Sequence, residues 1–174
     1  ARFDLDESKV RPYLKLDSMI DAAFDCANRL FGLSFKELDD VPRYHTDVRV
    51  WEVTGKSGKH VGVFIGDYFA RASKRSGAWM TSFRSQHNLG KGQRPIIVNV
   101  LNCAKVADGE PALLSFDDAR TLFHEFGHGL HGLLSDVTFP SIAGTAVSTD
   151  FVELPSQLYE HWLSAPEVLE RFAI

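Results

Sequence analysis

The stretch from Ser115 to about Leu134 limits the fold more than any other part of the sequence. Ser115 followed by Asp117 and Asp118 is typical of a helix start, because serine caps the first turn and acidic groups favour that end of the helix dipole. Apolar residues then recur on nearly every side of the predicted helix. Such a helix has to be buried among other elements, so we expect it to form the centre of the fold.

Residues 124–128 of this helix read His-Glu-Phe-Gly-His. Positions i and i+4 of a helix lie nearly above one another, so both imidazoles can reach one zinc ion while Glu125 points toward an open coordination position. So short a motif also arises by chance, but a buried Glu125 would be costly without a partner such as a metal. The pattern therefore predicts one zinc ion held by His124 and His128, with Glu125 as the base that activates water.

A catalytic zinc site usually has a third protein ligand. His131 lies on the same helix face but about 10 Å along the axis from His124, which would strain the site. A third histidine after a glycine turn is excluded, because His131 and Leu134 stand where that glycine and histidine would be required. Glu153, at the start of the next predicted helix, is the carboxylate that we favour as the third ligand.

Other polar residues have both a functional and a structural interpretation. Asp150 is equally suited to accept a hydrogen bond from a zinc-binding histidine and to cap a helix. Glu160 and His161 lie two turns beyond Glu153, where a structural polar pair is the favoured interpretation over support of the site. A basic group is more typical of a solvated loop than of a site for a substrate carboxylate; its members are Arg71, Lys74, Arg75 and Arg84.

The first half of the chain predicts two helices and a hairpin. Residues 16–31 place apolar side chains at helical spacing, with Gly32 positioned to end the helix. Ser34 and Glu37 suggest the cap of a second, short helix. Residues 48–54 and 60–69 flank a Gly-Lys-Ser-Gly turn, which predicts a β-hairpin.

The remaining segments complete an α+β fold that is mainly helical. Residues 95–101 are apolar and β-branched, and we expect them to form a third strand of the same small sheet. A helix should begin near Asp150, because Pro155 is tolerated only in a first turn. A further helix is expected from a capping box at Ser164 and Glu167. The small sheet should pack beside the zinc-binding helices.

Composition excludes several classes of partner. Nineteen basic against 23 acidic residues give a net charge of −4 without a strong basic patch, so we expect no nucleic-acid partner. Apolar runs are too short to span a bilayer, and the charged N-terminus differs from a signal peptide. Cys26 and Cys103 stand in apolar surroundings and predict buried free thiols, which favours the cytoplasm.

Several segments together resemble a known family. They lie at residues 44–52, 66–71, 77–80, 109–114 and 121–131. The most specific runs from Asp150 to Trp162 and reads Asp-Phe-Val-Glu-Leu-Pro-Ser-Gln-Leu-Tyr-Glu-His-Trp. The chain is thereby similar to the thimet oligopeptidase family of zinc metallopeptidases, and within it to the bacterial peptidyl-dipeptidase branch.

The resemblance implies a zincin-type core, with His124, His128 and Glu153 as zinc ligands and Glu125 as the catalytic residue. It also implies short peptides as substrates, admitted to a channel between two helical halves. Release of dipeptides from the C-terminus is the favoured activity, and internal cleavage of oligopeptides is the alternative. A domain in which zinc is purely structural is a remote third possibility, because such sites are usually rich in cysteine.

Family members also contain a region with a Gly- and Tyr-rich loop and a histidine that bind substrate, and this chain has no counterpart of it. The chain lacks an initiating Met and stops within a predicted helix. We therefore interpret residues 1–174 as part of a metallopeptidase catalytic domain, with the zinc site in residues 115–163. The rest of the full-length enzyme would be a partner of this part of the chain.

Overall fold

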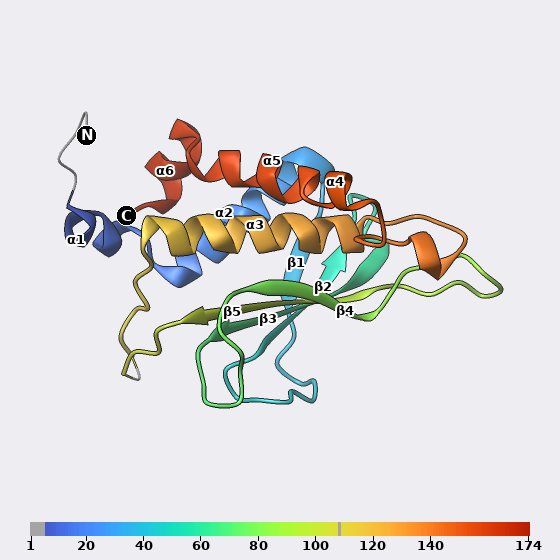
Figure 1. Ribbon diagram of the computed structural model, residues 1–174, viewed down its shortest axis with the longest axis horizontal. Helices are drawn as coiled ribbons and strands as arrows, with labels where there is room; N and C mark the ends of the chain where they lie inside the picture. The colour runs from blue at the N-terminus through green and yellow to red at the C-terminus, as the bar shows by residue number, and fades with distance from the viewer. Residues whose placement is uncertain (1–5, 108) are drawn as a thin grey trace.

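A computed structural model describes residues 6–107 and 109–174 and has an α+β architecture (Figure 1). A five-stranded sheet has the order β1-β2-β3-β5-β4, and helices lie against one of its faces. The strands are β1 (Ser34–Glu37), β2 (Arg49–Thr54), β3 (His60–Phe69), β4 (Trp79–Arg84) and β5 (Ile96–Cys103). The α-helices are α1 (Glu7–Val10), α2 (Leu16–Phe31), α3 (Phe116–Leu133), α4 (Thr149–Val152), α5 (Leu154–Leu163) and α6 (Pro166–Phe172), and 3-10 turns span Arg11–Tyr13 and Pro140–Ile142.

The hairpin and the third strand that the sequence predicts are confirmed. β2 pairs with β3 in antiparallel orientation, and β5 adds to β3 in parallel orientation. β5 also pairs with β4, an antiparallel edge strand that the sequence did not reveal. Because β4 lies at the edge next to α3, this missed strand forms part of the surroundings of the candidate site.

Residues 34–37 form a strand, and the prediction of a short helix there is wrong. β1 pairs with β2 in antiparallel register, with Phe35 opposite Val53. The ring of Phe35 stacks on that of Phe24 in α2, with centroids 4.0 Å apart. Strand pairing and burial of this ring therefore outweigh the local Ser-x-x-Glu pattern.

The two long helices form as the sequence predicts. Ser115 caps α3, and it forms a capping box in which Ser115 and Asp118 each accept a hydrogen bond from the other's backbone N–H. α2 ends at Gly32, whose φ of 69° lies in the left-handed region that glycine adopts without strain. α3 lies between the sheet on one side and α5 on the other, which confirms its central place.

The chain from Thr149 onward forms three short helices. The helix expected near Asp150 exists but is divided at Glu153, which ends α4 and precedes α5. Pro155 stands in the first turn of α5, where its missing N–H is tolerated. The capping box expected at Ser164 does not form, because Ser164 ends α5, and α6 begins at Pro166 without a side-chain cap.

The core fills the space between the sheet and the helices. Aromatic rings meet at its centre, where Phe64 of β3 and Phe126 of α3 lie 5.2 Å apart in an edge-on arrangement. Cys26 and Cys103 are buried free thiols, as the sequence predicts. Of the residues that the structure describes, none belong to a helix long and apolar enough to cross a membrane.

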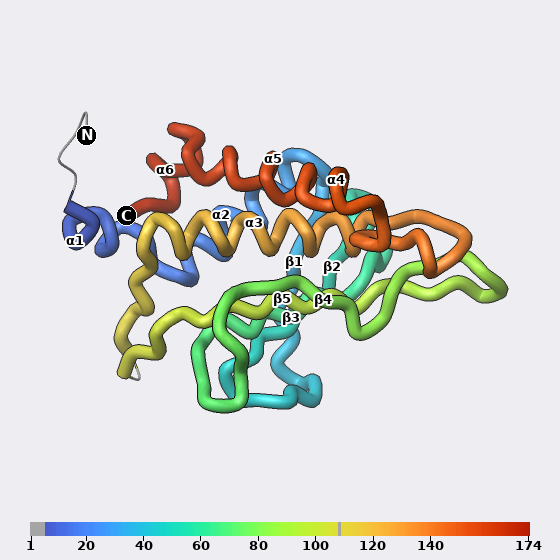
Figure 2. Tube along the Cα trace, in the orientation of Figure 1, coloured from blue at the N-terminus to red at the C-terminus, as the bar shows by residue number. Residues whose placement is uncertain are grey.

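Two loops lie side by side at the end of the sheet beyond β4 (Figure 2). Gln86 joins them: its Nε2 donates to the carbonyl of Val137 at 3.2 Å, and its Oε1 accepts from the N–H of Val137 at 2.9 Å. Asn88 adds a hydrogen bond of 2.8 Å to Asp136. These contacts fix the segment that connects α3 to α4, and with it the approach of the chain to Glu153.

Candidate metal centre

Helices α3 and α5 touch at Gly127, close to the candidate ligands. A Cβ atom at Gly127 would lie 2.7 Å from Cα of Ser156 and 2.9 Å from the carbonyl oxygen of Pro155, so only glycine fits there. This close approach brings the start of α5 next to the histidine motif of α3. Glu153 therefore faces His124 and His128 across the contact between the two helices.

The three predicted ligands converge. Oε2 of Glu153 lies 3.2 Å from Nε2 of His124 and 3.1 Å from Nε2 of His128. One ligand atom from each residue lies within 4.8 Å of the other two, and among the described residues His131 is not part of this cluster. Two imidazole nitrogens and one carboxylate oxygen are a donor set typical of catalytic zinc sites, so the residues fit such an ion.

Glu153 is oriented by the helix that it precedes. Oγ of Ser156, which is fully buried, lies 2.9 Å from both the carbonyl oxygen and Oε2 of Glu153. Burial raises the pKa of Glu153, but the hydrogen bond from Ser156 and the nearby histidines outweigh that effect and hold the pKa below its ordinary value. The carboxylate is thus kept charged. No motif in the sequence marks Ser156 for this role.

Glu125 lies beside the candidate ligands, and its pKa is shifted in the opposite direction to that of Glu153. Its side chain is buried, and burial raises its pKa from the ordinary value of 4.5 to about 7. A backbone hydrogen bond from Met80 of β4 opposes this shift. Oε2 has no hydrogen-bond partner among the described residues. A carboxyl group that changes charge near neutral pH is suited to take up and release protons.

Glu160 supports His124 from the side away from Glu153. Its Oε1 lies 2.6 Å from Nδ1 of His124, and its Oε2 lies 4.0 Å from Nε of Arg120. A carboxylate at Nδ1 holds the proton on that nitrogen and leaves Nε2 free to bind a metal. Asp150, which was weighed for this role, is exposed on α4, whose N-cap is Ser148. The sequence favoured a structural role for Glu160, although its spacing of two helical turns from Glu153 places both on one face of α5.

A large apolar groove of about 850 Å³ lies beside the centre, between α3, α5 and the loop that joins α3 to α4. His131 and His161 both line this groove. Burial lowers the pKa of His131, and its ring lies 6.3 Å from that of Phe151. Both histidines therefore lie in the groove and outside the candidate ligand cluster.

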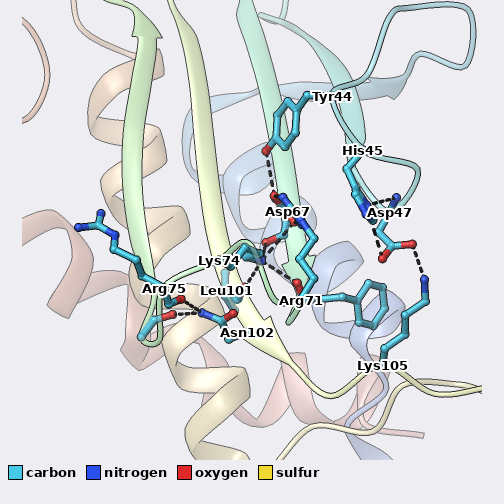
Figure 3. Close-up of polar contacts among 12 residues, drawn as sticks. Tyr44, His45, Asp47, Asp67, Arg71, Lys74, Arg75, Leu101, Asn102 and Lys105 are labelled. Atoms are coloured by element: carbon cyan, nitrogen blue, oxygen red, sulfur yellow. Dashed lines mark hydrogen bonds and ion pairs between the residues drawn. The ribbon is translucent and has the colours of Figure 1, made fainter.

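The basic group of the sequence is largely used in the fold (Figure 3). Arg71 makes two bonds of 2.7 Å to the buried carboxylate of Asp67, and Tyr44 donates a third at 3.0 Å. Nζ of Lys74 contacts Asp67 at 3.2 Å and three backbone oxygens, including that of Leu101 in β5. Burial raises the pKa of Asp67, but these bonds outweigh it and lower the pKa.

The other two members of that group also have protein contacts. The guanidinium of Arg75 lies 5.1 Å from the ring centre of Trp79, and Nε of Arg84 donates to the carbonyl of Arg94 at 2.8 Å. Asn102 further holds the loop by donating to the carbonyls of Arg75 and Gly77. The structural interpretation of the basic group therefore accounts for all four residues.

Comparison with known proteins points in the same direction. The model of peptidase family M3 matches residues 1–173. The chain is 50% identical to dipeptidyl carboxypeptidase of Escherichia coli over 173 residues, which are 99% of this chain and 25% of that protein. It is 36% identical to oligopeptidase A of the same species over 170 residues, which are 96% of this chain and 25% of that protein.

A more distant relative is mitochondrial intermediate peptidase 1 of Cryptococcus neoformans, at 34% identity over 201 residues, covering 94% of this chain and 26% of that protein. The chain thus spans about a quarter of the length of these curated relatives.

Proposed function

The chain belongs to peptidase family M3, and on that premise we propose that it carries the metal-binding and catalytic residues of a zinc peptidase acting on short peptides. The convergence of His124, His128 and Glu153 beside Glu125 is the observation that carries this proposal. Residues 1–174 would form part of a zincin-type catalytic domain, with the site in residues 115–163. The rest of the full-length enzyme would complete the substrate channel.

One zinc ion per chain would be held by the two histidines and Glu153. When bound, such an ion polarises the peptide carbonyl and makes water easier to deprotonate. Glu153 contributes a carboxylate that stays charged, and its negative charge offsets that of a divalent cation. Two neutral imidazoles complete the set, and the burial that lowers the pKa of His128 favours that neutral form.

Glu125 is the catalytic residue in this proposal. Its carboxylate takes a proton from the attacking water and then passes that proton to the nitrogen of the departing amine. Burial brings its pKa to about 7, so at neutral pH the carboxyl group can both gain and lose a proton at little cost in free energy. Peptide hydrolysis of this kind needs no covalent intermediate on the protein.

Glu160 and Arg120 position His124 in the same scheme. Oε1 of Glu160 accepts a hydrogen bond from Nδ1–H of His124 at 2.6 Å, which fixes the rotation of the ring and directs Nε2 toward Glu153. Nε of Arg120 lies 4.0 Å from Oε2 of Glu160, on the side of the carboxylate away from His124. The function of Glu160 is therefore to orient a ligand rather than to touch the substrate.

We favour release of C-terminal dipeptides, because identity to the dipeptidyl carboxypeptidase of E. coli is 50% and identity to its oligopeptidase A is 36%. Internal cleavage of oligopeptides is the second candidate. The buried free thiols suit a reducing compartment, and we place the protein in the cytoplasm.

Two measurements test the proposal. Elemental analysis should find one equivalent of zinc in the unsubstituted protein and none in a His124→Ala, His128→Ala double variant. The protein at its full length should cleave a short peptide with a free C-terminal carboxylate and leave its C-terminally amidated copy intact. Equal cleavage of both peptides would favour internal cleavage, and a full equivalent of zinc in the double variant would rule the site out.

A further inference from the structure

Helix α5 carries an apolar stripe on its outer side. Leu154, Leu158 and Trp162 follow one another at intervals of four residues, so they lie along one side of the helix. Their exposed fractions are between 41% and 56%. The opposite side of α5 is apolar as well, and there Tyr159 and Leu163 are buried in the core. A helix that is apolar on two sides is typical of one with neighbours on both.

The stripe forms one wall of the apolar groove beside the metal centre. The end of α2 contributes Leu30 and Phe31 to the same groove, and the loop between α3 and α4 contributes Ile142. All three of these side chains are exposed. Exposed apolar side chains from three separate elements therefore line one depression. A contiguous apolar surface of this kind typically marks an interface.

The stripe is turned away from the candidate ligands. Gln157 and Glu160, the polar residues of α5 that are spaced to share a side with Glu153, lie on a different side of the helix from Leu158. Glu160 contacts His124 from that side. A substrate held at the candidate ligands alone would therefore leave the stripe uncovered.

The length of the relatives indicates what covers the groove. The match takes in 99% of this chain but 25% of the dipeptidyl carboxypeptidase of E. coli, and 96% of this chain but 25% of its oligopeptidase A. Most of each relative lies outside the matched region. A covering segment of the same polypeptide would be held near the groove at a high effective concentration, which a separate molecule lacks.

We propose that the apolar groove docks an amphipathic helix from the part of the full-length protein outside residues 1–174. Side chains spaced by four residues form a ridge, and such a ridge packs into the surface of a second helix. The docked helix buries Leu158 and Trp162 beneath apolar side chains that recur at helical spacing. This contact is separate from the metal centre, and it stands whether or not the proposed function is correct.

Thiol labelling of the full-length protein tests whether the groove is covered. Leu158→Cys places a thiol in the stripe, and Gln157→Cys is the matched control on an exposed neighbour. In native protein free of peptide, a maleimide should modify position 158 at least about a hundredfold more slowly than in denatured protein, because a buried thiol is inert. Position 157 should differ little between the two states. A position 158 that reacts at its denatured rate would overturn the proposal.

A photo-crosslink tests which segment covers the groove. Trp162 is replaced in the full-length protein by a phenylalanine that carries a benzophenone. The crosslinked peptide should come from outside residues 1–174, in a product with the mass of one chain. A product of doubled mass would assign the groove to a second copy of the protein. That result, or the absence of any crosslink to a peptide outside residues 1–174, would overturn the proposal.

Leu158→Asp tests whether the contact contributes to stability. At a side chain that stays 56% exposed, aspartate would meet water and change the Tm little. Beneath a docked helix the charge would be buried without a partner, so the Tm of the full-length protein should fall by about 2 °C or more. Gln157→Asp is the control, and a Tm of Leu158→Asp no lower than that of the control would count against docking. Labelling and crosslinking decide the question if Leu158→Asp does not fold.

Discussion

Nδ1 of His124 lies 2.6 Å from Oε1 of Glu160, while its Nε2 lies 3.2 Å from Oε2 of Glu153. The imidazole is therefore held between two carboxylates, one at each ring nitrogen. Glu153 is the N-cap residue of α5, and Glu160 lies within the same helix. One carboxylate belongs to the proposed metal ligands. The other lies on the far side of the ring, where its second oxygen is 4.0 Å from Nε of Arg120.

Removal of Glu160 should weaken zinc binding without removing a ligand. Loss of a partner at the outer nitrogen of a metal-binding histidine typically costs about 10–100-fold in affinity. We expect that loss for Glu160→Ala and a smaller one for Glu160→Gln, which keeps an acceptor but loses the charge. Competition with a chelator of known affinity measures it. Glu167→Gln on exposed α6 is the control, and an equal loss there would point to a general electrostatic effect.

Glu153→Ala should weaken zinc binding more than any substitution of an outer partner, because it removes a ligand oxygen and leaves two histidines. His131→Ala should leave the affinity unchanged, because His131 lies in the apolar groove. Titration of metal-free protein with zinc compares the two variants. The reverse result, with His131 required and Glu153 dispensable, would mean that the third ligand is misassigned.

Glu125→Gln should keep its zinc and lose hydrolysis, since the residue is not a ligand but carries the proton. We expect kcat to fall by at least about a hundredfold in the full-length protein. Elemental analysis alongside the peptide assay separates the two effects. Turnover close to that of the unsubstituted protein would place the base elsewhere, or support a zinc ion with a purely structural role.

The raised pKa of Glu125 also predicts how stability depends on pH. Burial moves the pKa from 4.5 in the unfolded chain to about 7 in the folded one, so the folded state binds this proton more tightly. Its favourable contribution is complete below pH 4.5 and is lost as pH rises toward 7, by up to about 3 kcal/mol.

In metal-free protein, Glu125→Gln should therefore be more stable than the unsubstituted chain at about pH 8. This advantage in stability should be much smaller at about pH 5. Denaturant unfolding in the presence of a chelator gives the two free energies of unfolding. A difference that does not vary with pH would show that Glu125 titrates normally in the folded chain.

Asp67→Asn should destabilise the fold by about 3–5 kcal/mol, because it leaves Lys74 as a buried charge without its carboxylate. The side chain of Lys74 is only 4% exposed, so water cannot replace the lost partner. Denaturant unfolding at neutral pH measures the change. Asp39→Asn removes the exposed pairing with Arg43 and should change the stability by less than about 1 kcal/mol.

The sequence predicted those parts of the molecule that depend on local chemistry. The capping box at Ser115 and the spacing of His124 and His128 depend only on residues close together in the sequence, and α3 forms as they predict. The hairpin of β2 and β3 follows from its turn, and the family resemblance follows from several short motifs along the chain. The comparisons confirm that resemblance.

Features that depend on tertiary contacts were missed. β4 lacks a strong alternating pattern because its side chains are half-exposed on both faces. β1 carries a helix-capping pattern that pairing with β2 overrides. Glu160 was considered from the sequence and a structural role was favoured. Its contact with His124 depends on how α5 packs against α3, which no local pattern encodes. The roles assigned to Glu125 and Glu153 stay predictions until the variants are measured.

The contact at Gly127 ties helix packing to chemistry. Because a Cβ there would meet Ser156 at 2.7 Å, nineteen of the twenty amino acids would force α5 away from α3. The same displacement would draw Glu153 away from both histidines. The packing of the two helices and the position of the proposed ligand Glu153 therefore depend on the same small residue. A side chain at position 127 would therefore disturb the helix pair and the proposed ligand cluster together.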